Sequence, residues 1–191
     1  MKPFFTVHAG EFVAGDFIGR TFRYVDVWVP AKDRGIDLLV TDSRCKKAVS
    51  LQVKFSRDYL VTDMPAEFQK PLRACGWWTL NRPKIAESPA DYWIFVLAGF
   101  ARRTTDFVII KPSELLTRLD AIHGRKGRKG RKGRTVRIQS YLWVTETGQC
   151  WETRGLTRSD QRAIAQGTFS DRARDFTAFL NNWQPIEKLK G

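Results

Sequence analysis

Residues 35–55 read GIDLLVTDSRCKKAVSLQVKF, and this stretch decides the fold. Two runs rich in apolar and β-branched residues, 36–41 and 49–55, flank a polar segment at 42–47. Strand-length runs separated by a short polar connection are typical of a β-hairpin. The sequence therefore predicts two adjoining antiparallel strands.

Two polar residues interrupt the second apolar run. Gln52 and Lys54 are two positions apart, so on a strand they share one face, while the apolar residues around them face the other. Lys54 is the only lysine in the chain with Asp, Glu or Gln two positions before it. Asp37 lies on the neighbouring predicted strand, where pairing could bring its carboxylate to the same face. Two polar residues on an otherwise apolar strand need either water or a site.

Oxygen-bearing side chains in this arrangement suit a hard divalent cation. Mg²⁺ prefers oxygen ligands in octahedral geometry and keeps several waters, so the Asp37 carboxylate, the Gln52 amide oxygen and a main-chain carbonyl would suffice. Glu11, on a helix predicted at residues 11–20, could add a second carboxylate.

Further elements surround the hairpin. A continuous apolar run at residues 91–98 is typical of a strand buried on both faces, and residues 72–80, with Trp77 and Trp78, lead into it. Shorter strands are predicted at residues 22–29 and 107–110.

The second half of the chain predicts helices and another hairpin. Ser113 is expected to cap a helix at residues 113–119, and a hairpin turns about Gly148 between residues 136–144 and 150–153. A helix at 159–166 ends at Gly167. A last helix begins at Ser170, with helically spaced core residues Ala173, Phe176, Phe179, Leu180 and Trp183.

These elements predict an α+β fold (α/β/α) with a mixed central sheet. At 191 residues with 42% hydrophobic content, the chain should form one compact domain. Within it we expect a core at 1–120, a basic loop at 121–135, and a C-terminal hairpin with helices at 136–191, packed on the core.

Composition excludes several classes of protein. The longest nearly uncharged apolar run, residues 92–101, is about half the roughly 20 residues that a membrane span needs, and no secretion signal stands near Met1. We expect a cytoplasmic protein without membrane contact. Cys45, Cys75 and Cys150 are too widely spaced for a zinc knuckle and, being three, form no disulfide framework.

Histidines are equally scarce. His8 and His123 are the only two, which excludes His-pair nucleases and multi-histidine metal hydrolases. Any hydrolytic chemistry must depend on carboxylates, lysine and a metal.

The charge balance indicates a polyanionic partner. Thirty-three Lys and Arg against 20 Asp and Glu leave a formal net charge of +13, which favours nucleic acid. Seven of the cations lie in residues 124–134, GRKGRKGRKGR, where glycine at every third position disfavours a helix. Each could pair with a DNA phosphate, a contact that carries no base information. They are Arg125, Lys126, Arg128, Lys129, Arg131, Lys132 and Arg134. The alternative is a solvated low-complexity loop without a partner.

Glu11 on a first helix, Gly35-Ile36-Asp37 on a strand and Gln52-Val53-Lys54 on the next strand resemble the PD-(D/E)XK superfamily of restriction-endonuclease-like nucleases. The resemblance covers about residues 10–112 and is to its QxK variant, similar to the Holliday-junction-resolvase and type IV restriction enzyme branches. Gln52 stands where an acid is usual, which removes one negative charge, and Ile36 replaces proline.

The resemblance implies an αβββαβ core and divalent-metal-dependent cleavage of DNA, with Mg²⁺ or Mn²⁺ as cofactor. It implies Glu11, Asp37 and Gln52 as metal ligands, and Lys54 as the residue that positions or activates water. Double-strand cleavage by a single-site enzyme would favour a homodimer.

Each of these residues also has a purely structural explanation. Asp37 could end a turn, Gln52 and Lys54 could form the solvated face of an edge strand, and Glu11 could be an acid favoured at a helix N-terminus. Two other functions stay open. One is a catalytically inactive nucleic-acid-binding module on a nuclease-like fold, with contacts from the basic loop and from Trp77, Trp78 or Trp143. The other is a structural protein of a ribonucleoprotein particle.

Overall fold

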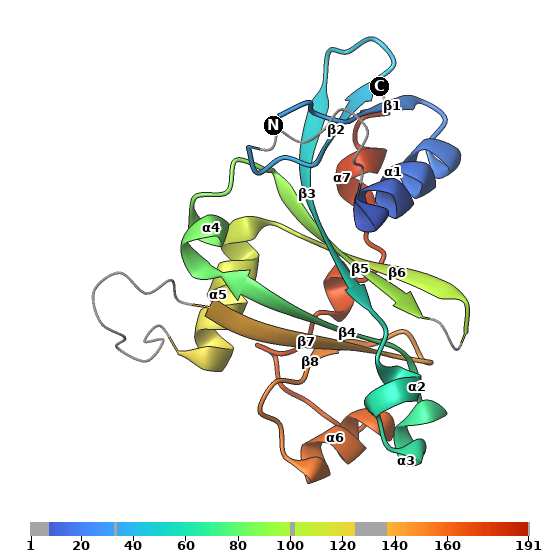
Figure 1. Cartoon of the computed structure of the whole chain (residues 1–191), viewed down its shortest axis with the longest axis vertical. Coiled ribbons are helices and arrows are strands. Elements are labelled where there is room, and N and C mark those ends of the chain that lie inside the picture. Colours follow the sequence, from blue (N-terminus) through green and yellow to red (C-terminus); the bar gives the residue numbers. More distant parts are fainter. Residues whose placement is uncertain (1–7, 33, 100–101, 125–136, 191) are drawn as a thin grey trace.

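The computed structural model describes residues 8–32, 34–99, 102–124 and 137–190, which form two β-sheets with helices around them (Figure 1). The larger sheet has five strands in the order β1-β2-β3-β5-β6, with β3 and β5 parallel and the other neighbours antiparallel. The predicted α+β class with a mixed sheet is confirmed. These strands are β1 (Val25–Trp28), β2 (Leu38–Asp42), β3 (Ala48–Arg57), β5 (Tyr92–Gly99) and β6 (Thr104–Ile110).

The hairpin predicted from residues 35–55 is confirmed. Strands β2 and β3 pair antiparallel, with Leu38 opposite Leu51. The continuous apolar strand is also confirmed, because β5 lies between β3 and β6 and buries both faces. Ile94 and Val96 point into one core cluster, whereas Phe95 belongs to the other.

Helices cover one face of the larger sheet. Helix α1 (Ala9–Thr21) packs on β3, where Ala14 and Ile18 join the cluster that contains Leu51 and Val53. The short helix α7 (Gln184–Glu187) adds Ile186 to the same cluster. Burial of this apolar face fixes the register of β3 and therefore sends Gln52 and Lys54 to the opposite face.

A second sheet covers the opposite face. It has the order β4-β7-β8, formed by β4 (Leu72–Asn81), β7 (Arg137–Thr145) and β8 (Cys150–Glu152). Trp78 of β4 packs edge-to-face on Phe95 of β5 at 5.0 Å between ring centroids. Helix α5 (Pro112–His123) completes this layer with Leu115 and Leu119. This face is therefore covered by a sheet as well as by a helix, which differs from the expected α/β/α layering.

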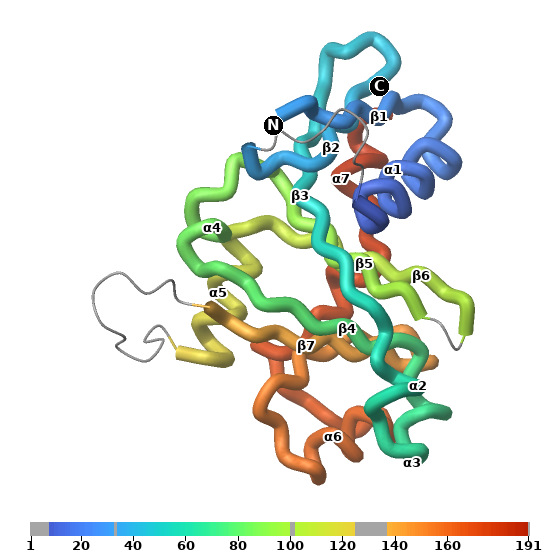
Figure 2. The backbone as a smooth tube through the Cα atoms, in the orientation of Figure 1, coloured from blue at the N-terminus to red at the C-terminus, as the bar shows by residue number. Residues whose placement is uncertain are grey.

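The C-terminal hairpin is built into this second sheet. Strands β7 and β8 pair antiparallel as predicted, with Gly148 at φ +82° in the turn between them. Strand β7 also pairs along its length with β4, which comes from the first 120 residues (Figure 2). The two parts of the chain therefore share one sheet.

The connection between the parallel strands β3 and β5 differs from a single crossover helix. It contains β4 together with three short helices, α2 (Leu60–Asp63), α3 (Ala66–Gln69) and α4 (Arg82–Ala86). Where an αβββαβ core would have one helix between the third and fourth strands, this chain passes through its second sheet.

The helix predicted from Ser170 is wrong. Residues 170–183 contain turns and a short 3-10 helix, η1 (Thr177–Phe179), because their main chain bonds to neighbouring strands. Phe176 N–H donates to Cys150 O at 2.8 Å, and Asn181, at φ +50°, makes bonds to Phe107. The helical spacing did identify core residues, since Phe176 and Trp183 are buried.

The other three predicted helices, α1 among them, form, with one correction. Helix α6 (Arg158–Ala165) is followed by Gly167 at φ +72°, as expected. Helix α5 begins at Pro112 with Lys111 as its N-cap, so the predicted capping role of Ser113 is wrong. Proline suits the first helical position because it has no N–H to satisfy. None of the described helices has the length and apolar composition needed to cross a membrane.

Candidate active site

The site is built on an open edge of strand β3. The pairing of β2 with β3 reaches Leu38 opposite Leu51, and Asp37 N–H donates to Leu51 O at 2.8 Å. Beyond this point β3 continues to Arg57, and no strand among the described residues pairs with that edge. Main-chain polar groups on an unpaired edge need other partners.

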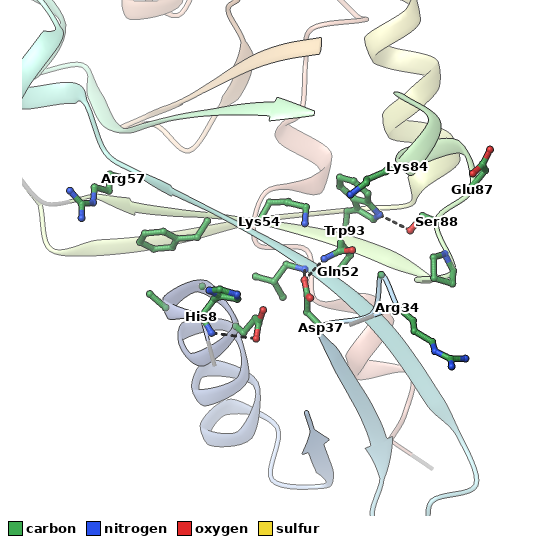
Figure 3. Close-up of a pocket in the computed structure, with 17 residues that line it drawn as sticks. His8, Arg34, Asp37, Gln52, Lys54, Arg57, Lys84, Glu87, Ser88 and Trp93 are labelled. Atoms are coloured by element: carbon green, nitrogen blue, oxygen red, sulfur yellow. Dashed lines mark hydrogen bonds between the residues drawn. The ribbon is translucent and has the colours of Figure 1, made fainter. Parts of the chain in front are cut away.

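Asp37 supplies one of those partners. Its Oδ2 accepts a hydrogen bond from Val53 N–H at 2.8 Å and another from the Gln52 side-chain amide (Figure 3). Asp37 is 4% exposed and Gln52 9%, so the pair is almost fully buried. The carboxylate predicted to meet Gln52 across the hairpin therefore does so.

Lys54 lies on the same face of β3 as Gln52. Its Nζ is 5.3 Å from the centroid of the Trp93 ring, on β5. The Trp93 indole N–H donates to Ser88 Oγ at 2.8 Å, which fixes the ring. A cation over an indole face is favoured electrostatically, so Trp93 helps to orient the ammonium group.

Glu11 reaches the site from α1, which covers the other face of the sheet. The helix can come this close because Gly10 has no side chain, and a Cβ there would lie 2.6 Å from Phe55 Cβ. Glu11 is 4% exposed, and its Oε2 accepts a bond from His8 N–H at 3.4 Å. It therefore accepts a hydrogen bond from a main-chain N–H at the start of the helix while also lining the pocket.

Gly35 positions the chain just before Asp37. Its φ of +85° belongs to a region that residues with a Cβ rarely adopt, and a Cβ there would lie 3.1 Å from Pro89 Cδ. The same position faces Gln52, whose Oε1 would be 3.8 Å away. Glycine therefore allows the chain to pass between Pro89 and the site.

The residues surround an open pocket of about 990 Å³. Glu11, Asp37, Gln52 and Lys54 all line it, so the structure brings together the four residues that the sequence singled out. Exposed cations lie around them. Figure 3 shows Arg57 at one end of the site and Lys84 and Arg34 towards the other.

The charges are arranged in two zones. Buried carboxylates lie in the centre, whereas Arg34, Arg57 and Lys84 lie at exposed positions of the lining. One lining acid, Glu87, is also exposed, so this outer zone carries three cations against one acid, and its net positive charge concentrates anionic ligands. This pocket can therefore attract an anion such as a phosphodiester, but two carboxylates would repel it at the centre unless a cation lies between them.

Oxygen donors of the type that Mg²⁺ prefers are present at that centre. They are the carboxylates of Asp37 and Glu11 and the amide oxygen of Gln52 after a rotation of its amide. The Val53 carbonyl joins them, since in a strand it points to the same side as the Val53 N–H. Among the described residues no group of three or more His, Cys, Asp and Glu side chains is placed to hold a metal. A cation here would therefore depend on amide, main-chain and water oxygens besides the two acids.

Several residues that line the pocket are not among the site residues predicted from the sequence. Arg57 carried a signal, being the next cation after Lys54 on the same strand, and Arg34 directly precedes Gly35. Lys84, Ser88 and Trp93 carried none, because their position depends on the path of the chain through β4 and α4. The seven cations from Arg125 to Arg134, predicted to bind DNA, lie outside the described residues.

Comparison with protein-family models, with curated proteins and with solved structures found no match to this chain.

Proposed function

We propose that this protein is a divalent-metal-dependent DNA endonuclease that hydrolyses phosphodiester bonds with Mg²⁺ or Mn²⁺. The observation that carries the proposal is the contact between Asp37 and Gln52 at the open edge of β3, with Lys54 and Glu11 lining the same pocket. The resemblance of these residues to the PD-(D/E)XK nucleases supports the same conclusion. The free thiols of all three cysteines fit a cytoplasmic location.

Asp37, Glu11, Gln52 and the Val53 carbonyl would hold the cation. A bound Mg²⁺ supplies Lewis-acid polarisation of the phosphate and makes water a better nucleophile near neutral pH. The protein contributes a fixed, largely buried set of oxygen atoms. Because β3 is held by both its neighbour β5 and the core beneath it, these atoms need little reorganisation when substrate binds.

Lys54 would act on the substrate directly. Its ammonium group, oriented over Trp93, would stabilise charge that develops on the phosphate oxygens and align the attacking water. The water oxygen forms a bond to phosphorus while the bond from phosphorus to the leaving deoxyribose oxygen breaks. One proton passes from the water to solvent, and the leaving oxygen takes up another.

The exposed cations of the pocket would bind the DNA backbone. Arg34, Arg57 and Lys84 are spread along the pocket, so they can contact successive phosphates on either side of the cleaved bond. The basic segment from Arg125 to Arg134 would add contacts that do not depend on sequence.

Plasmid cleavage tests the proposal. We expect nicking or linearisation with Mg²⁺ or Mn²⁺ and none with EDTA. Asp37→Ala and Lys54→Ala should each lower the rate by at least about 100-fold. Asp26→Ala and Lys70→Ala, which change an exposed acid and an exposed lysine outside the pocket, are the matched controls and should cleave normally. Activity that survives both pocket substitutions, or EDTA, would exclude this mechanism.

One observation favours a second function, a nucleic-acid-binding module without turnover. The neutral amide of Gln52 already satisfies Asp37, so the pocket is stable as a hydrogen-bonded pair. DNA binding without cleavage in Mg²⁺, Mn²⁺, Co²⁺ or Ca²⁺ would support this alternative.

A further inference from the structure

The second sheet exposes part of its outer face. Cross-strand pairing places Trp77 opposite Tyr141, Thr79 opposite Gln139 and Asn81 opposite Arg137, all on that face because they are two residues apart. The row from Tyr141 to Arg137 is about 13 Å long at the usual rise per residue.

The other half of the same face is covered. Cys75 and Trp143, the next pair along β4 and β7, are buried with Leu60, Phe68 and Ile164 of α2, α3 and α6. Figure 1 shows these helices at one end of the sheet. Tyr59 marks the border, since its hydroxyl accepts a bond from the Trp143 indole at 2.8 Å.

An aromatic platform lies at the start of the open half, formed by Trp77, Tyr141 and Arg154. Trp77 is 48% exposed, and its ring lies 24° from parallel with the Tyr141 ring at 6.4 Å between centroids. The Arg154 guanidinium is 5.4 Å from the Tyr141 centroid, and its N–H donates to the Tyr141 hydroxyl at 3.4 Å. Tyr59 meets Tyr141 edge-on. Tyr141 is thus fixed from two sides, and Trp77 is left as the exposed ring.

The platform adjoins the candidate active site. Trp77 N–H donates to Ser56 Oγ at 2.9 Å, and Ser56 follows Lys54 by two residues on the same face of β3. The next residue, Arg57, lines the pocket. The Ser56 contact therefore places the platform beside the end of the pocket at which Arg57 lies.

We propose that the aromatic platform binds single-stranded nucleic acid, with one base stacked on Trp77 and a phosphate paired with Arg154. Flat aromatic rings on an open sheet face, next to cations, stack bases of any identity because every base has a π-face. Charge complementarity favours this occupant, since Arg57, Arg137 and Arg154 are exposed around the platform of a chain with a net charge of +13. An acidic peptide could pair with the cations but carries no regular series of flat bases to stack on Trp77.

The binding proposal does not depend on cleavage. Its consequence for the substrate rests on the proposed nuclease function: the preferred substrate carries a single strand beside the cleaved bond, as at a flap, an overhang or a gap. A blunt duplex would use the cations but leave Trp77 without a base.

Binding of labelled oligonucleotides in EDTA tests the platform without cleavage. Oligo(dT) and oligo(U) of equal length should bind wild-type protein. Trp77→Ala should weaken that binding by about 5- to 150-fold, the range measured for one lost stacking contact. Trp77→Phe, which keeps a ring, should recover most of the affinity, and a loss for either oligonucleotide supports the platform. Trp28→Ala is the matched control, since Trp28 is 52% exposed on the other sheet.

Other outcomes would overturn the platform. They are unchanged affinity in Trp77→Ala, an equal loss in Trp28→Ala, or an equal loss of blunt-duplex binding. Salt titration adds a readout that a structural role would not give: Trp77→Ala should keep the wild-type salt slope, whereas Arg154→Ala should reduce it by about 0.7. Asp26→Ala, which changes an exposed acid on β1 outside the pocket, should bind single strands normally. If no variant cleaves but the Trp77 effect holds, the nuclease proposal fails and the platform stands.

Discussion

The carboxylate of Asp37 accepts a hydrogen bond from Val53 N–H at 2.8 Å, so a side chain occupies the place where a neighbouring strand would pair. The same oxygen accepts a bond from Gln52. Asp37 therefore closes the edge of β3 in addition to its proposed role as a metal ligand. A substitution that removes it therefore costs stability, because a buried N–H then lacks its partner.

Gln52→Glu should lower the stability of the metal-free protein and raise its affinity for a divalent metal. The introduced carboxyl would contact Asp37, and repulsion between two buried like charges raises its pKa. Because the folded pKa is raised, the destabilisation appears as pH rises above about 4.3 and disappears below it. We expect a lower melting temperature than wild type at pH 7 in EDTA, and a larger rise on adding Mn²⁺. A variant with wild-type stability in EDTA would contradict the observed contact.

Gly35→Ala should destabilise the protein by about 1–3 kcal/mol, because alanine is strained at φ +85° and its Cβ would crowd Pro89. Urea unfolding measures the change. Gly19→Ala is the control, since Gly19 lies in α1 with no atom within 4 Å of an added Cβ, and it should stabilise by about 0.5–1 kcal/mol. Equal effects of the two substitutions would argue against the described path of the chain at Gly35.

Thiol labelling should distinguish the three cysteines. Cys45 is exposed, whereas burial raises the pKa of the Cys75 and Cys150 thiols well above its usual value. At pH 8 a disulfide reagent should modify one thiol rapidly in native protein and three after unfolding. The two raised values also predict that stability falls as pH rises above about 8.5, because the unfolded thiols ionise while the folded ones stay protonated. Rapid labelling of all three native thiols would contradict the two cores that contain Cys75 and Cys150.

The basic segment should set the salt dependence of duplex binding. Replacing its seven cations, Arg125 to Arg134, with glutamine should weaken DNA binding at low salt and reduce the slope of log K against log salt by up to about 6. The melting temperature serves as the control for folding. Unchanged affinity and slope would remove the segment from the binding surface.

The sequence predicted the centre of the site well because its signals are local. Alternation around Gln52 and Lys54, and a hairpin of short connection, determine which side chains meet, and Asp37 does contact Gln52. The metal ligation, the DNA substrate and the homodimer, which were also inferred from the sequence, stay predictions.

The errors came from contacts between distant parts of the chain. Residues 170–183 have helical apolar spacing, yet Phe176 and Asn181 bond to strands β8 and β6, which competes with helix formation. Lys84 and Trp93 lie at the site because the chain between β3 and β5 passes through β4. The pairing partner of β4 lies more than 50 residues later in the chain. Periodicity within a short window contains no information on such pairings.

The position of β4 ties the pocket to the order in which the chain is made. Strands β2 and β3 leave the ribosome early, and their hairpin can form alone, but β4 must wait for β7 before its edge is paired. Until then Lys84 lies on a helix, α4, that follows an unpaired strand and is held mainly by α5, through the ion pair of Arg82 with Asp120. The candidate site is therefore completed only when the C-terminal hairpin docks, so a partly synthesised chain holds the acids and the lysine without a finished pocket.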